Sequence, residues 1–230
     1  MLKVGSVNHL RYVMASNPVT LLAFSLFGVM MFVAIFGPLL VPYDPLASTS
    51  TGALQPPSWQ HWFGTDQVGR DVFSRVIVAT RLDLIISISA VALSFVLGSF
   101  LGSVSGFWGG WTDRILGRVL DTIMAFPLFV LAMGIVAASG NTIQNVVIAT
   151  AIINLPFYAR VARSEVAIRR NAGWVQAAKL AGNSDSVILL TRVFPNILPP
   201  MMVQISLNMG WAILNAAGLS FIGLGVMPPT

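Results

Sequence analysis

The sequence predicts an all-α integral membrane protein, and three observations predict this fold class. Of the 230 residues, 56% are hydrophobic and only 9% are charged, whereas a soluble domain carries about 25% charged residues. The mean hydropathy is +0.81. Five apolar segments reach the roughly 20 residues that a membrane-spanning helix needs. Because a chain this short cannot hide the apolar surplus in a larger core, lipid must be the solvent for most of its surface.

Composition also argues against several functions. The chain has no cysteine, so we expect neither a disulfide framework nor a thiolate metal site. Its two histidines, His9 and His61, are far apart, and we expect no zinc centre within the chain. Basic loops of a membrane protein explain the net charge of +5 better than nucleic-acid binding does.

The five spans can be placed by their apolar runs. They are predicted at Val19–Val41, Leu84–Trp108, Val119–Ala138, Thr142–Val161 and Asn196–Ile222. The first run exceeds the roughly 7–15 residues of a signal peptide and has no small-residue cleavage site after it, so it is interpreted as a retained anchor. Small residues on the second and fifth spans, among them Gly98 and Gly102, indicate either close helix packing or ordinary glycine usage. Pro127 and Pro156 predict kinks.

Charge predicts the orientation of these spans. Ten of the thirteen Lys and Arg residues lie before the first span or in the loops that follow the second and fourth spans. The positive-inside rule therefore places residues 1–18 and the loop 162–195 in the cytoplasm. An apolar bundle that ends at Phe221–Thr230 looks incomplete, so we expect a further span beyond this sequence.

The segment 42–83 is too polar to span and is predicted to lie on the extracytoplasmic side of the membrane. We expect Thr65 to cap an amphipathic helix at the membrane interface, with Asp66 in its first turn and Asp71 paired with Arg75 four residues on. Trp59 and Trp62 would anchor this segment at the boundary. It is either a contact or gating element, or a simple lid over the next span.

Few residues suggest catalysis. Asp66, Arg70 and Asp71 lack a cooperating histidine or serine, and Ser94 and Ser206 have no basic partner at membrane depth, which argues against an intramembrane hydrolase.

Asp113 and Asp121 flank the entrance to the third span and could relay protons. Ion pairs with the neighbouring Arg114 and Arg118 are the preferred interpretation.

The loop after the fourth span contains a short helix pattern. Gly173 allows a break, Gln176–Ala181 favours helix, and Gly182 is predicted to end it. Two helical turns are not stable alone in water, so this helix needs a surface to dock on. Its alanines and glycine favour close docking on a soluble partner over an interfacial connector that touches only lipid.

These residues resemble known motifs. Gln176-Ala177-Ala178, followed by Gly182 and Pro195, resembles the Glu-Ala-Ala motif of ABC-importer permeases, with glutamine replacing the glutamate and Phe194 where leucine is usual. Two further segments resemble the dipeptide/oligopeptide/nickel permeases: the late segment Ala216–Thr230, with Asn215 where many relatives carry glutamate, and a Gly-Thr-Asp, Gly-Arg-Asp, Ser-Arg signature in Phe63–Leu84. The signature residues are Gly64, Thr65, Asp66, Gly69, Arg70, Asp71, Ser74 and Arg75.

The resemblance implies a type I ABC-importer permease of the second, C-type kind, which usually has six spans, in a bacterial or archaeal inner membrane. It implies a permease core over 84–230, a second homologous permease, two ATPase subunits and an extracytoplasmic binding protein. The implied coupling helix that docks on an ATPase comprises Gln176, Ala177, Ala178, Ala181 and Gly182. Peptides are the implied substrate, with nickel, metallophores or opines as alternatives.

The resemblance also implies a transport subunit rather than an enzyme. The chain has no phosphate-cradling G-x-x-x-x-G-K-[ST] loop. ATP and magnesium would therefore bind to the partner ATPases, with no cofactor in this chain.

An ion-coupled secondary transporter is the alternative from another class. It would require ionisable residues at mid-span, and spans one, two, four and five contain almost none at their centres.

Overall fold

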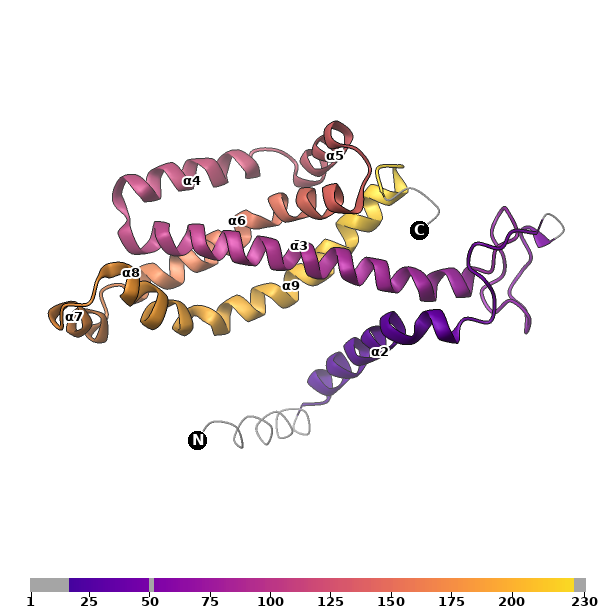
Figure 1. The fold of residues 1–230 in the computed structure, drawn as a ribbon, viewed down its shortest axis with the longest axis horizontal. Helices are drawn as coiled ribbons and strands as arrows, with labels where there is room; N and C mark the ends of the chain where they lie inside the picture. Colours follow the sequence, from indigo (N-terminus) through magenta and orange to yellow (C-terminus); the bar gives the residue numbers. More distant parts are fainter. Residues whose placement is uncertain (1–16, 50–51, 226–230) are drawn as a thin grey trace. The chain divides into compact units, whose positions relative to one another are not determined.

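The computed structural model describes residues 17–49 and 52–225, and helices make up most of that part of the chain (Figure 1). The predicted all-α membrane fold is confirmed, because four of these helices are long and apolar enough to cross a membrane, or five if a bent pair counts as one span. The basic residues Lys3 and Arg11, His9 and the C-terminal prolines lie outside the described residues.

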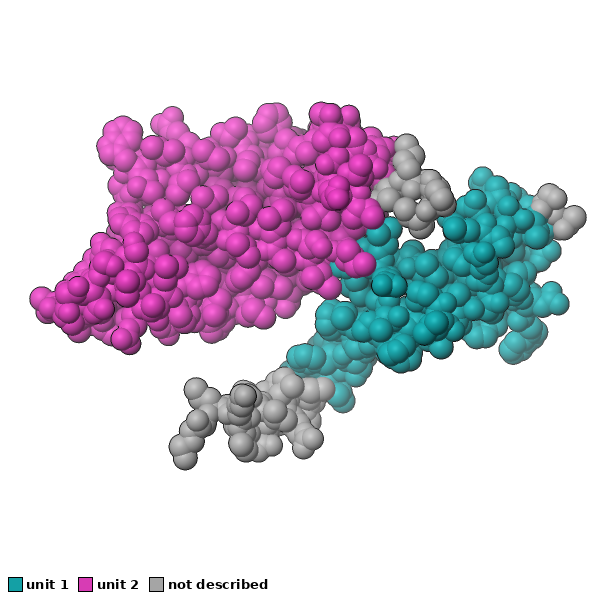
Figure 2. Space-filling model, viewed as in Figure 1, with its two compact units in different colours: residues 1–84 teal, residues 85–230 magenta. Residues whose placement is uncertain are grey.

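The chain divides into two compact units, residues 1–84 and residues 85–230 (Figure 2). Helix α3 (Val72–Trp108) contributes its beginning to the first unit and the rest to the second. The two units are described separately below.

The first unit contains α2 (Pro18–Leu40), the irregular segment after it and the first turns of α3. Asn17 caps α2 by accepting the N–H groups of Val19 and Thr20, at 3.0 and 3.3 Å. The side chains of α2 are apolar all round and mostly exposed, with only Ala34 and Gly37 buried. Such a helix suits lipid as its solvent, and its bounds agree with the predicted first span.

Helix α3 begins twelve residues earlier than the predicted second span. The expected separate helix capped by Thr65 is wrong, because the helix starts at Val72 and continues without interruption to Trp108. No glycine or proline stands between Val72 and Leu97 to break it. The residue that caps α3 is Asp71, whose Oδ2 accepts the N–H of Ser74 at 2.8 Å.

The predicted third span, Val119–Ala138, is not one continuous helix. Helix α4 (Gly110–Met124) and helix α5 (Leu128–Ser139) meet at a bend of 86°. Pro127 is the physical cause, because it has no N–H to donate and it disfavours helical geometry at the residue before it. The predicted kink is therefore a full break.

Helix α6 (Ile143–Arg169) is the central helix of the second unit. It packs against α4, α5 and α9 (Phe194–Phe221), and it contains more buried residues than α9. Thr142 caps it by accepting the N–H of Asn145 at 3.2 Å. Helix α6 continues through the buried Pro156.

Three glycines let α3 approach the α6 backbone directly. A Cβ built on Gly98, Gly102 or Gly106 would lie 2.7, 2.1 or 2.5 Å from a carbonyl oxygen of α6. No larger residue fits at such distances, so close helix packing, one of the two alternatives left by the sequence, is confirmed for α3.

The loop after α6 is largely helical. Helix α7 (Gly173–Leu180) is followed by α8 (Asp185–Ile188) and by the π-helical turn η2 (Leu189–Val193), which leads directly into α9. The apolar helical stretch therefore runs from Asp185 to Phe221 and starts before the predicted fifth span at Asn196.

Candidate functional site: the α7 loop

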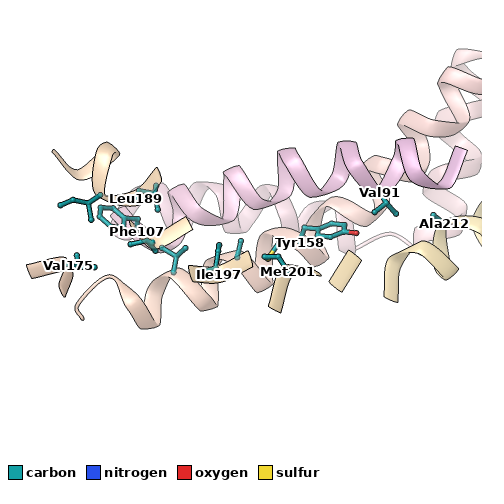
Figure 3. Close-up of a cluster of buried hydrophobic side chains, with 12 residues drawn as sticks. Val91, Phe107, Tyr158, Val175, Leu189, Ile197, Met201 and Ala212 are labelled. Carbon is teal, nitrogen blue, oxygen red and sulfur yellow. The ribbon is translucent and has the colours of Figure 1, made fainter. Parts of the chain in front are cut away.

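Helix α7 has one face in the core of the second unit. Val175 is fully buried and belongs to the hydrophobic cluster that also contains Phe107, Val166, Ile188 and Leu189. Figure 3 shows Val175 at the end of this cluster where Phe107 and Leu189 also lie. Because two helical turns do not persist alone in water, this buried contact is what holds α7 in place.

The other face of α7 is exposed. Gln176, Ala177, Ala181 and Gly182 are exposed, and Leu180 is 90% exposed. The fifth residue expected on the docking face, Ala178, is partly buried and packs against the core cluster. The structure therefore divides the predicted set into four outward residues and one inward residue.

Gly182 ends the helix as the sequence predicted. Its φ is +82°, a left-handed conformation that favours glycine. Its N–H donates to the carbonyl of Lys179 at 2.9 Å, and the N–H of Asn183 donates to the carbonyl of Ala178 at 3.2 Å. A Cβ built on Gly182 would meet no atom within 4 Å, so this turn is open to an approaching surface.

Lys179 connects α7 to its neighbours. Its Nζ lies 3.0 Å from Oδ1 of Asp185 at the start of α8 and 5.4 Å from the ring centre of Phe107 in α3. An exposed ion pair adds little stability. A cation above an aromatic face adds a directional contact, so Lys179 helps to set the orientation of α7.

Ion pairs join both ends of α4 to the second half of α6. Asp113 accepts hydrogen bonds from the guanidinium of Arg163, with Nη2 at 2.6 Å, and Asp121 accepts from Nη2 of Arg160 at 2.7 Å. Ion pairing of these aspartates is thus confirmed, but the expected partners Arg114 and Arg118 are wrong. The antiparallel packing of α4 on α6 brings arginines from 39 and 50 residues away.

The signature segment forms a second structured region, in the first unit. Asp66 accepts the N–H groups of Val68 and Arg70, both at 2.9 Å, and pairs with the guanidinium of Arg75. The expected pairing of Asp71 with Arg75 is wrong, because Asp71 caps α3. Burial would raise the pKa of Asp66, but the two backbone donors and Arg75 outweigh it and hold the pKa below its usual value.

Asp71 has a partner that sequence reasoning missed. Nδ1 of His61 lies 2.9 Å from Oδ1 of Asp71, and the ring of Tyr43 lies 4.8 Å from the His61 ring. Burial acts to raise the pKa of Asp71, but hydrogen bonds from Ser74 and His61 outweigh it and lower that pKa. The ten-residue separation of His61 and Asp71 across an irregular turn gives no periodic signal that could have revealed this contact.

The remaining signature residues build the turn itself. Gly64 and Gly69 have φ values of +73° and +78°, and a Cβ on either would lie within 2.4 Å of a backbone oxygen. Thr65 Oγ1 accepts the N–H of Gln55 at 2.8 Å, and Ser74 is fully buried in the first turn of α3. The signature therefore specifies a local fold at the entrance to α3. Within the described ranges, no three His, Asp or Glu side chains group to hold a metal ion.

The long helices carry exposed apolar side chains, which is typical of a multi-pass membrane protein. Helix α7 is buried on one face and exposed on the other, so it presents a surface on which a partner protein could dock. A family model described as "Binding-protein-dependent transport system inner membrane component" matches residues 94–230. A second, "N-terminal TM domain of oligopeptide transport permease C", matches residues 12–57. The chain therefore belongs to the binding-protein-dependent ABC permeases, in the C-type group that the motifs indicated.

Curated relatives support the same family assignment. The chain is 41% identical over 219 residues to the probable D,D-dipeptide transport system permease protein DdpC of Escherichia coli K12, covering 95% of this chain and 74% of the relative. It is 41% identical to the dipeptide permease DppC of Alkalihalophilus pseudofirmus, over 86% of this chain and 65% of the relative. It is 36% identical to the glutathione permease GsiD of Pectobacterium atrosepticum, over 86% of this chain and 66% of the relative. The chain thus spans about two thirds to three quarters of the length of these relatives.

Proposed function

We propose that this chain is the transmembrane permease subunit of an ATP-driven importer that takes up short peptides delivered by an extracytoplasmic binding protein. Family membership supports the transport role. The names of two of the relatives above, which specify dipeptides, support peptides as the substrate class. The subunit works in the bacterial inner membrane with its N-terminus, residues 1–18, in the cytoplasm.

The two-faced α7 carries the mechanistic part of this proposal. Its buried face ties it to α3, α6 and α8 through Val175, and its exposed face offers small side chains over which a partner surface can close without hindrance. In our proposal α7 is the coupling helix, seated in a groove of a cytoplasmic ATPase. Movement of the ATPase would push α7, and the core contacts would pass this movement to the bundle.

The assembly that follows contains a second, homologous permease, two ATPases and the binding protein, all in contact with this chain or its pair. ATP and magnesium bind to the ATPases. The segment 19–41 is the first span, 42–83 the outer segment and 84–230 the permease core with its cytoplasmic loop 162–195. Gln176 stands where the related motif has glutamate, so docking relies on shape and hydrogen bonding rather than on a carboxylate.

An exposed alanine provides the cleanest test. Ala177→Arg adds a long cation to the docking face without disturbing the core, because Ala177 is exposed in the chain. We expect ATP-dependent uptake of radiolabelled dialanine by the reconstituted complex to fall at least tenfold, since a mismatched charge at an interface costs several kcal/mol. The ATPase subunits should also be lost on purification in mild detergent.

Asn171→Arg is the matched control, because Asn171 is exposed just before α7 and gains the same charge. It should retain both uptake and ATPase binding. Normal uptake and normal ATPase retention by Ala177→Arg would refute the docking proposal.

Substrate class is tested separately. The mass spectrum of the ligand retained by the cognate binding protein should show short peptides. A nickel chelate, a metallophore or an opine in that spectrum would contradict the proposed peptide substrate, while the proposal of an ATP-driven importer would still stand.

A further inference from the structure

Helix α4 has a basic and apolar outer face that the proposed function does not use. Arg114, Ile115 and Arg118 are exposed, and Trp111, one turn before them, is 75% exposed. Their spacing of three and four residues places these side chains on one side of the helix. The opposite side packs on α6, with Leu120 buried (Figure 1). The outer face therefore combines guanidinium groups with large apolar side chains.

Ion pairs to α6 fix the level of this outer face. Asp113 pairs with the guanidinium of Arg163, and Oδ1 of Asp121 lies 2.7 Å from Nη2 of Arg160. Both arginines of the outer face lie between these two aspartates along α4. The outer face is therefore level with the part of α6 that carries its arginines.

That part of α6 marks the edge of the membrane. No charged residue occurs from Ile143 to Ala159, and this stretch is about 26 Å long at 1.5 Å per residue, close to a hydrocarbon core of about 30 Å. Charged residues of α6 then begin at Arg160. The outer face of α4 therefore lies at the level of the phospholipid headgroups, where tryptophan is also enriched.

The arginines of α4 differ from those of α6 in what they contact. Three arginines near the end of α6 each pair with a carboxylate: Arg160, Arg163 and Arg169. Among residues 17–49 and 52–225, no ion pair or hydrogen bond is found for the side chains of Arg114 and Arg118. The Arg114 guanidinium lies over the Trp111 ring, 5.6 Å from its centre. The N–H donors of both arginines are thus available to an anion.

We propose that the outer face of α4 binds the phosphate of an anionic phospholipid. Arginine makes charge-assisted hydrogen bonds to phosphate oxygens, and two arginines one helical turn apart can contact the same headgroup. Ile115 and Val119, which are 58% and 52% exposed, lie beside them and provide contacts for the glycerol and the acyl chains. A soluble anion would gain nothing from these apolar side chains. The proposal goes beyond the transport role and does not depend on the transported substrate.

Photocrosslinking in the complete reconstituted transporter tests this assignment. p-Benzoylphenylalanine in place of Ile115 puts a photoreactive group between the two arginines. The vesicles contain equal amounts of dioleoylphosphatidylglycerol and dioleoylphosphatidylcholine, and mass spectrometry identifies the products. The anionic lipid should form roughly five times more adduct or above, because each arginine near an anionic membrane surface favours binding about fivefold.

Leu26 provides the control position, because it is exposed on α2, a helix without charged residues. p-Benzoylphenylalanine in place of Leu26 should react with the two lipids in the equal proportions of the vesicles. Combining Arg114→Gln with Arg118→Gln should bring the ratio at position 115 close to that at position 26.

Two further variants separate the site from net charge. Arg192→Gln removes an exposed positive charge from η2 and should leave the ratio at position 115 unchanged. Combining Arg114→Lys with Arg118→Lys should keep most of the preference, because both charges remain. Retention of the partner subunits during purification shows that each variant is assembled.

Several outcomes would overturn the proposal. A product at position 115 formed mainly with another protein subunit would make the outer face of α4 a subunit interface. Equal labelling of the two lipids, or an unchanged preference in the double glutamine variant, would show that the two arginines do not select an anionic headgroup. Loss of the preference in excess inorganic phosphate at constant ionic strength would assign the arginines to a soluble anion.

Thermal unfolding of the transporter in detergent gives a second, independent measurement. Added dioleoylphosphatidylglycerol should raise the unfolding temperature more than dioleoylphosphatidylcholine does, because a ligand that binds the folded state stabilises it. The double glutamine variant should lose part of this difference, and Arg192→Gln should keep all of it. Equal differences in the wild type and the double variant would contradict the proposal.

Discussion

At the scale of single residues, the contacts that a glycine makes, rather than its residue type, decide whether it is needed for helix packing. Gly102 and Gly117 both lie inside helices, and a sequence pattern does not separate them. Only Gly102 faces another backbone, with the Ala159 carbonyl oxygen 2.1 Å from the position of a Cβ, whereas a Cβ on Gly117 would meet nothing within 4 Å. Sequence reasoning could therefore propose close packing on α3 but could not prove it.

These two glycines give a paired prediction. Gly102→Ala should destabilise the purified protein by about 1–3 kcal/mol, because the methyl group overpacks the α3–α6 contact. Gly117→Ala should be neutral or stabilising by up to about 1 kcal/mol, since alanine is the better helix former. Thermal unfolding in detergent, followed by loss of the monodisperse species, measures both, and equal effects would show that the backbone contact is absent.

At the scale of elements, helix α7 depends on its neighbours for its existence. Its predicted helical character and its end at Gly182 were accessible from sequence because they are local properties. The division between inward Val175 and Ala178 and outward Ala177 and Ala181 was not accessible, because it depends on where Phe107 and Ile188 lie after folding.

Val175→Ala tests this dependence. Loss of two methyl groups from a fully buried position should remove about 1–3 kcal/mol from the docking of α7. Since an isolated eight-residue helix is unstable, the amides of Gly173–Leu180 should exchange with deuterium at least tenfold faster. Amides within Val91–Ser105 of α3 serve as the internal reference and should be unchanged. Unchanged exchange in α7 would mean that something other than the core cluster holds it.

At the scale of the whole molecule, composition and apolar run length are sufficient to predict the fold class and most spans. They fail where tertiary structure intervenes. The break at Pro127 replaces a predicted span, α3 absorbs a predicted surface helix, and the arginine partners of Asp113 and Asp121 come from α6. Each failure concerns a choice between local alternatives that only packing resolves.

The orientation of the chain remains a prediction at this scale. Reporter fusions test it: green fluorescent protein joined after Asn183 should fluoresce, and alkaline phosphatase joined after Ser58 should be active, because the first site lies on the basic side and the second outside. The reverse pattern at either site would invert the proposed topology and remove α7 from the reach of a cytoplasmic ATPase.

The contact between α3 and α6 also has a mechanical consequence. The backbones of α3 and α6 are in contact at three glycines that are spaced four residues apart. The two helices therefore cannot slide or rotate against each other without steric overlap, and they form the stiff element of the bundle. The flexibility that a conformational change requires must therefore lie in other helices of the bundle. The beginning of α9 suits that role, because Pro195, Pro199 and Pro200 leave carbonyl groups of the preceding turn without their usual N–H donors, directly beside the wide turn η2. During a transport cycle the start of α9 would then bend while the α3–α6 pair moves as a rigid body.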